Sequence, residues 1–137
     1  MNIYNLKTNY LMNPIGFLMD TVALSWIIEA PFEEELQGTS VLIALDENFE
    51  EVIHDSGMQA DLDPLCYQPE IKLQPRMRYF WKVIAKNVSG DESSSEIHYF
   101  EKAKEEEHWT GNWIEPARQL QRMPLVRKLF RLPAKPI

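Results

Sequence analysis

The chain has 137 residues, enough for one ordinary domain and a short additional segment. Its hydrophobic fraction of 45%, which includes four tryptophans, can fill a core without the help of a disulfide or a metal. The formal net charge of −7 argues against a general nucleic-acid-binding protein, because binding to phosphates requires a concentrated basic surface.

The number of cysteines and the hydropathy of the chain indicate the cellular compartment. Cys66 is the single cysteine, which excludes an intramolecular disulfide, and we expect a buried, unreactive thiol there. No stretch is apolar over the length needed to cross a bilayer, and Met1 to Tyr10 lack the features of a secretion signal. We therefore expect a cytoplasmic protein with no membrane partner.

Hydrophobic periodicity favours strands almost throughout residues 3–100. In chain order, the predicted strands cover residues 3–11, 22–28, 39–45, 52–57, 66–73, 77–87 and 95–100. A turn signal at Asn13–Gly16 closes the first strand, and residues 46–51 are predicted to form a turn or a single helical turn. Pro69 interrupts the fifth strand, which we therefore expect at a sheet edge.

The clearest strand is 77–87, in which apolar side chains occupy every second position. One face carries Met77, Tyr79, Trp81, Val83 and Ala85. About seven short strands separated by turn signals are typical of an all-β, immunoglobulin-like β-sandwich. We place Trp26, Tyr79 and Trp81 in its core.

The chain changes character after residue 101. Residues 102–116 form a charged linker that contains Trp109 and Trp113, and the apolar pattern after Pro116 predicts one more strand. We interpret residues 117–137 as the truncated first strand of a following β-domain. Because the unpaired edge of a lone apolar strand seeks another chain, we expect residues 124–132 to pack on their own sandwich or to pair two molecules as a dimer.

Two sets of motifs carry a resemblance to known families. Residues 73–87, with Gly90 and Ser94–Glu96, resemble the sixth and seventh strands of fibronectin type III domains, and Leu24–Trp26 resembles the second strand. In that family the tyrosine at the position of Tyr79 forms a corner with the preceding loop. The resemblance covers residues 10–101 and implies a fibronectin type III-like sandwich, which we assign to residues 1–101.

The second resemblance is more specific because it depends on the order of several motifs. The motifs are Asn13–Gly16, Leu24–Trp26, Asp55–Gly57, Arg78–Val83, Trp109–Ile114 and Pro124–Phe130. In this order they are similar to the N-terminal region of bacterial α-L-rhamnosidases, where a fibronectin-like module is followed by a tryptophan-containing linker and a second β-domain. The last motif fits the Pro-Leu-x-Arg-Lys-x-Phe strand that opens the second domain.

The resemblance implies a non-catalytic N-terminal module of an enzyme that releases terminal α-L-rhamnose with inversion. In the family the reaction belongs to an (α/α)6 barrel far downstream, and none of its catalytic motifs matches this chain. We therefore assign no catalytic residue and no cofactor, and we expect the downstream domains of the same polypeptide to be the partners.

The remaining candidate residues leave alternatives open. His54, His98 and His108 are far apart and lack a second ligand at metal spacing, so we assign no metal site. Trp109 and Trp113 can stack on sugars or anchor one domain against the next, and we favour the anchor. One alternative is a carbohydrate-binding module in which these tryptophans or Tyr99 stack on rhamnose-containing glycans; another is a stand-alone fibronectin-like interaction domain.

Overall fold

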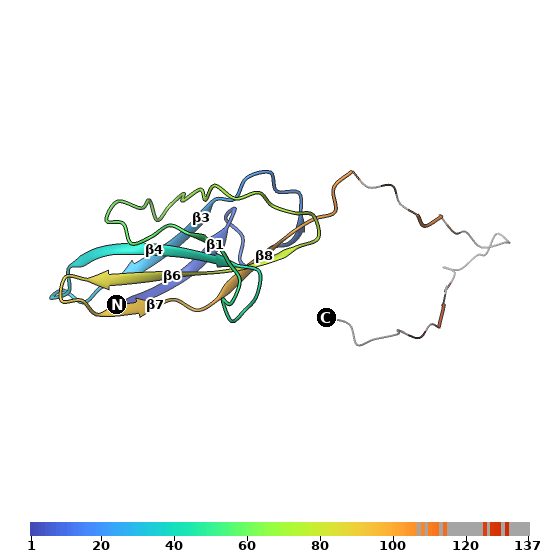
Figure 1. The fold of residues 1–137 in the computed structure, drawn as a ribbon. Coiled ribbons are helices and arrows are strands. Elements are labelled where there is room, and N and C mark those ends of the chain that lie inside the picture. Colours follow the sequence, from blue (N-terminus) through green and yellow to red (C-terminus); the bar gives the residue numbers. More distant parts are fainter. Residues whose placement is uncertain are drawn as a thin grey trace. The chain divides into compact units, whose positions relative to one another are not determined.

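The computed structural model describes residues 1–106, 108, 110–112, 114, 125, 127–129 and 131. The chain divides into two units, Met1–Glu107 and His108–Ile137. The strands of the first unit are β1 (Asn2–Thr8), β2 (Ile15–Phe17), β3 (Leu24–Glu29), β4 (Leu36–Ala44), β5 (Val52–Asp55), β6 (Arg78–Asn87), β7 (Glu92–Ser94) and β8 (His98–Lys102) (Figure 1). Within the described part of the chain, no helix is long and apolar enough to cross a membrane.

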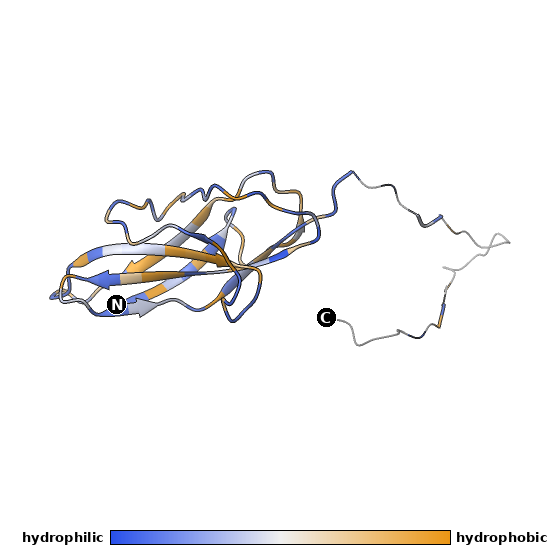
Figure 2. Ribbon diagram, viewed as in Figure 1, coloured by the Kyte–Doolittle hydropathy of each residue, from blue (hydrophilic) through white to orange (hydrophobic). Residues whose placement is uncertain are grey.

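The strands form two sheets. One consists of β1 and β3, and the other has the order β2-β8-β6-β4-β5, with β7 also paired to β6. The neighbours are antiparallel except for β2 and β8, which run parallel. Hydrophobic residues recur along the strands of both sheets (Figure 2), and the apolar core lies between the two layers. The prediction of an all-β, immunoglobulin-like sandwich is confirmed.

The alternation predicted for residues 77–87 is seen in β6, where every second side chain is buried. Trp81 is completely buried, and Trp26 and Tyr79 are each 2% exposed, so all three side chains lie in the core. Tyr79 stacks on Phe100 with ring centroids 5.2 Å apart. The backbone N–H of Gln74 donates a hydrogen bond of 2.7 Å to the Tyr79 hydroxyl, which is the corner that the fibronectin resemblance implies.

The strand predicted at residues 66–73 is wrong. Only Tyr67 pairs with β3, through two backbone hydrogen bonds with Leu24, and the rest of the segment has no strand geometry. Pro64 and Pro69 lie on either side of Tyr67, and proline has no N–H to donate, so a continuous ladder cannot form here. The buried thiol expected at Cys66 is also wrong: its neighbour Tyr67 faces inward, and Cys66 is exposed.

Two parts of the larger sheet differ from the prediction. Asn13 does end the first part of the chain, but β2 follows directly and pairs in parallel with β8. The side-chain oxygen of Asn13 accepts the N–H of Tyr99 at 3.0 Å, which ties the two segments together. The strand predicted at residues 95–100 begins only at His98, as β8, and β7 lies before the predicted segment. Between the two strands Ser95 turns inward, and its Oγ accepts the N–H of Val83 at 3.0 Å.

Candidate functional site

The two tryptophans predicted at the joint, Trp109 and Trp113, lie outside the described residues, so their anchoring or sugar-stacking role stays a prediction. Of the linker expected at 102–116, the structure describes residues 102–106, 108, 110–112 and 114, whereas the truncated strand expected at 117–137 falls largely outside the described part. Of residues 124–132, the structure describes 125, 127–129 and 131, none of which is in a strand. The dimer expected through this segment therefore stays a prediction too. β8 ends at Lys102, one residue beyond the domain end expected at 101.

Tyr99, the third candidate for sugar stacking, lies on the outer face of the larger sheet. It is paired across the strands with Phe80, and their ring centroids are 6.3 Å apart. The Arg78 guanidinium lies 4.8 Å from the centre of the Tyr99 ring and makes an ion pair of 3.1 Å with Glu101. The guanidinium therefore occupies the space over one face of this ring.

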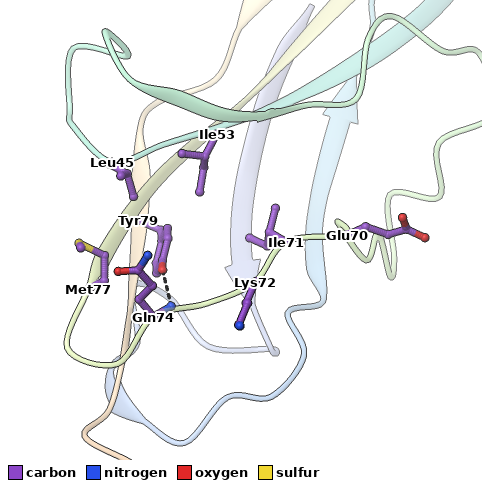
Figure 3. A pocket seen from close by; sticks show the side chains of 8 residues that line it. All are labelled: Leu45, Ile53, Glu70, Ile71, Lys72, Gln74, Met77 and Tyr79. Carbon is purple, nitrogen blue, oxygen red and sulfur yellow. Dashed lines mark hydrogen bonds between the residues drawn. The ribbon is translucent and has the colours of Figure 1, made fainter.

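A pocket of about 240 Å³ opens at the end of the sandwich where β4 ends and β6 begins (Figure 3). The apolar and aromatic residues that line it are Leu45, Ile53, Ile71, Met77 and Tyr79. Glu70, Lys72 and Gln74 supply its polar groups. Inverting glycoside hydrolysis needs one carboxyl group as acid and a second as base, and the residues that line this pocket supply one carboxylate. The lining therefore lacks the second carboxyl group that this reaction requires.

A hydrogen bond that sequence analysis missed links the two layers. His54 of β5 and Tyr67 beside β3 approach to 2.8 Å between Nε2 and the phenol oxygen. Burial lowers the pKa of the His54 imidazole, and the charge of Asp55 opposes part of this shift. Burial also raises the pKa of the Tyr67 hydroxyl. The two residues are 13 positions apart on different sheets, so no local pattern could have paired them.

The exposed apolar surface of β2 is a second feature that appears only in three dimensions. Ile15 and Phe17 are each 50% exposed, and the following Leu18 is 76% exposed. β2 lies beside the end of β8, and the N–H of Ala103 donates to the carbonyl oxygen of Phe17 at 2.9 Å. This apolar edge is therefore adjacent to the point where the chain leaves the last strand of the sandwich.

A metal centre is not formed by the described residues, among which no group of three or more His, Cys, Asp or Glu side chains converges. His54 and His98 lie on β5 and β8, which are separated by β4 and β6 in the larger sheet. The described acidic and imidazole groups therefore do not provide the convergent ligands that zinc or calcium requires.

Comparison with known structures gives two α-L-rhamnosidases of similar local fold. The chain matches the Streptomyces avermitilis enzyme, solved with L-rhamnose, with a TM-score of 0.64 and 22% identity over 74% of its residues. It matches the α-L-rhamnosidase from Dictyoglumus thermophilum with a TM-score of 0.61 and 22% identity over 75% of its residues. The chain spans 10% and 12% of the length of these two proteins.

No curated protein matches the chain at a significant level. A family model does match it over residues 3–105, and that family is described as the Rha78A-like, N-terminal immunoglobulin domain. The match covers both sheets and ends shortly after β8. It confirms the resemblance of the chain to the N-terminal region of the rhamnosidases. The chain therefore belongs to the Rha78A-like N-terminal immunoglobulin domain family.

Proposed function

We propose that this chain contributes a non-catalytic structural module to an inverting α-L-rhamnosidase, and that its partners are downstream domains of the same polypeptide. The observation that carries the proposal is the family match over residues 3–105. It is supported by the size of the two rhamnosidases of similar fold, of which the chain spans about a tenth. A sandwich of this size can position a neighbouring domain, while the reaction needs two carboxyl groups around a sugar pocket.

The β2 edge is the surface that we assign to contact with a downstream domain. Its exposed apolar side chains lie next to the end of β8, where the chain leaves the sandwich and the linker to the following segment begins. Covering exposed apolar side chains with a partner domain removes them from water and lowers the free energy, and contacts between domains of one chain commonly bury such surface. The edge strand would at the same time be protected from pairing with other chains.

The proposal is tested by comparing two proteins on an aryl α-L-rhamnoside. One is the 137-residue chain, and the other is the longest protein that the reading frame encodes around it. We expect hydrolysis by the longer protein alone, and NMR of the first product should show the β anomer, as inversion of an α-linkage requires. Hydrolysis by the 137-residue chain, or an inactive longer protein, would overturn the proposal.

A further inference from the structure

A second pocket lies at the open edge of the sandwich, between β1 and the connection from β7 to β8. It has a volume of about 300 Å³, within the range of small-molecule sites in proteins. The pocket is separate from the β2 edge, and it shares no lining residue with the pocket in Figure 3. Its size suits one ring of a sugar.

Two irregularities of the backbone form this pocket. In β1 the register with β3 shifts between Tyr4 and Lys7, and Asn5 adopts a φ of 57°. A left-handed residue inside a strand is characteristic of a β-bulge, which redirects the side chains next to it. On the opposite side β7 ends at Ser94 and β8 begins only at His98, so Glu96 lies in a short connection without strand pairing.

The polar lining combines two amides, a carboxylate and an imidazole. The amides are those of Asn2 and Asn5 on β1, and the carboxylate and imidazole are those of Glu96 and His98. The Nδ1 atom of His98 is buried and has no hydrogen-bond partner in the described part of the chain. Burial lowers the pKa of His98, partly opposed by the charge of Glu96, so the ring is neutral at neutral pH. Because Nδ1 is covered, Nε2 is the ring nitrogen through which His98 would bind a ligand.

The apolar lining is concentrated in the floor and on one side. Ile3 and Leu6 are buried core residues that reach the pocket from β1. Met12, which is 63% exposed, and the half-exposed Tyr4 supply an apolar rim and an aromatic ring. A ligand that fits this surface carries several hydroxyl groups on one side and an apolar group on the other.

The charges of the lining restrict the ligand further. Glu96 is a carboxylate, and no lysine or arginine is among the described residues that line the pocket. An anionic ligand would therefore be repelled, whereas carboxylate and amide oxygens accept hydrogen bonds from neutral hydroxyl groups. The pocket matches a neutral polyhydroxylated ring.

We propose that this pocket binds a single 6-deoxyhexose ring, with the sugar hydroxyls on Asn2, Glu96 and His98 and the C6 methyl group on the apolar floor. The inference rests on the proposed function for the sugar used as a probe, L-rhamnose. The bulge in β1 and the break between β7 and β8 have a common role in this proposal, since together they open the space that the ring occupies.

The proposal is tested by titrating the 137-residue chain with L-rhamnose and following the imidazole C–H signals by NMR. We expect the His98 signals to shift and to saturate with a millimolar dissociation constant, while the signals of His54, at the other end of the sheet, stay unchanged. L-mannose, which carries a hydroxyl on C6, should bind about tenfold more weakly because that hydroxyl would meet the apolar floor. Equal binding of the two sugars would overturn the assignment of the methyl group.

Two variants locate the binding. Glu96→Gln should weaken L-rhamnose about tenfold, since a charge-assisted hydrogen bond is lost. Glu92→Gln, the same change on β7 outside the pocket, should leave it unchanged. If Glu96→Gln lowers the melting temperature, Tyr4→Ala at the half-exposed rim gives the second test and should also weaken binding. Binding that neither variant weakens, or no saturable shift with L-rhamnose, would overturn the site.

The outcome separates this inference from the proposed function. An active longer protein whose 137-residue chain does not bind L-rhamnose would remove the sugar site and leave the structural module intact. An inactive longer protein with a chain that binds L-rhamnose at this pocket would remove the link to hydrolysis and leave the sugar site.

Discussion

The tyrosine corner gives the sharpest test of how the loop before β6 is held. In Tyr79→Phe the buried ring and its stacking on Phe100 are kept, and only the hydroxyl is removed. The hydroxyl accepts the N–H of Gln74 at 2.7 Å, so the substitution loses this bond and leaves a partly buried backbone donor without its partner. Losing a neutral hydrogen bond costs about 1 kcal/mol, and the unpaired donor raises the total to about 1–2 kcal/mol.

Urea denaturation followed by tryptophan fluorescence measures this difference. We expect a lower midpoint with an unchanged slope, and a melting temperature about 5–10 °C lower for a unit of this size. Tyr99→Phe is the matched control, because that ring lies on the outer face of the sheet, and its loss of a hydroxyl should change stability by less than about 0.5 kcal/mol. Equal effects of the two substitutions would refute the account of the corner.

Three further predictions follow from burial, space and the exposed edge. Burial lowers the pKa of both His54 and His98, so the unfolded chain binds more protons than the folded chain. The free energy of unfolding should be highest above about pH 6.5 and should fall as the pH drops through the folded-state pKa values. Replacing both histidines with Gln should reduce the pH dependence of the urea midpoint. Gly38→Ala should destabilise by about 1–3 kcal/mol in the same assay, because its Cβ would lie 2.8 Å from a facing backbone carbonyl oxygen, and wild-type stability would contradict this. Phe17→Asp should lower the melting temperature of the longer protein but not of the 137-residue chain, whereas the fully exposed Phe32→Asp should change neither; equal effects of the Phe17 change on both proteins would argue against a covered edge.

Local periodicity predicted most of the core. The alternation through β6 and the apolar positions of β3 depend only on neighbouring residues, since successive side chains of a strand point to opposite faces. Leu24, Trp26, Tyr79 and Trp81 could therefore be identified as inward-facing from the sequence. The order of short motifs along the chain was also sufficient for the family, which the match over residues 3–105 bears out.

The predictions that were wrong concern segments whose pairing partners are distant in sequence. The segment around Tyr67 has the composition of a strand, but its backbone hydrogen bonds to β3 are limited to the bridge between Tyr67 and Leu24 and one bond accepted by the Pro64 carbonyl. The parallel pairing of β2 with β8 joins residues about 85 positions apart, and a turn signal at Asn13 contains no information about it. The surface position of Cys66 follows from that single bridge, which sets the face on which Tyr67 lies.

For this protein the sequence alone determined the inward-facing side chains of β3 and β6 and the family to which the sandwich belongs. The inner face is encoded in residues close together in the chain, where a period of two is enough to distinguish it from the outer face, and the family is encoded in the order of short motifs along the chain. The tertiary structure decided where a pocket and an exposed apolar edge lie on the surface. Asn2, Asn5, Glu96 and His98 line one pocket only because a bulge in β1 lies opposite the break between β7 and β8, and the β2 edge is exposed beside the end of β8 only because the chain crosses between sheets after β1.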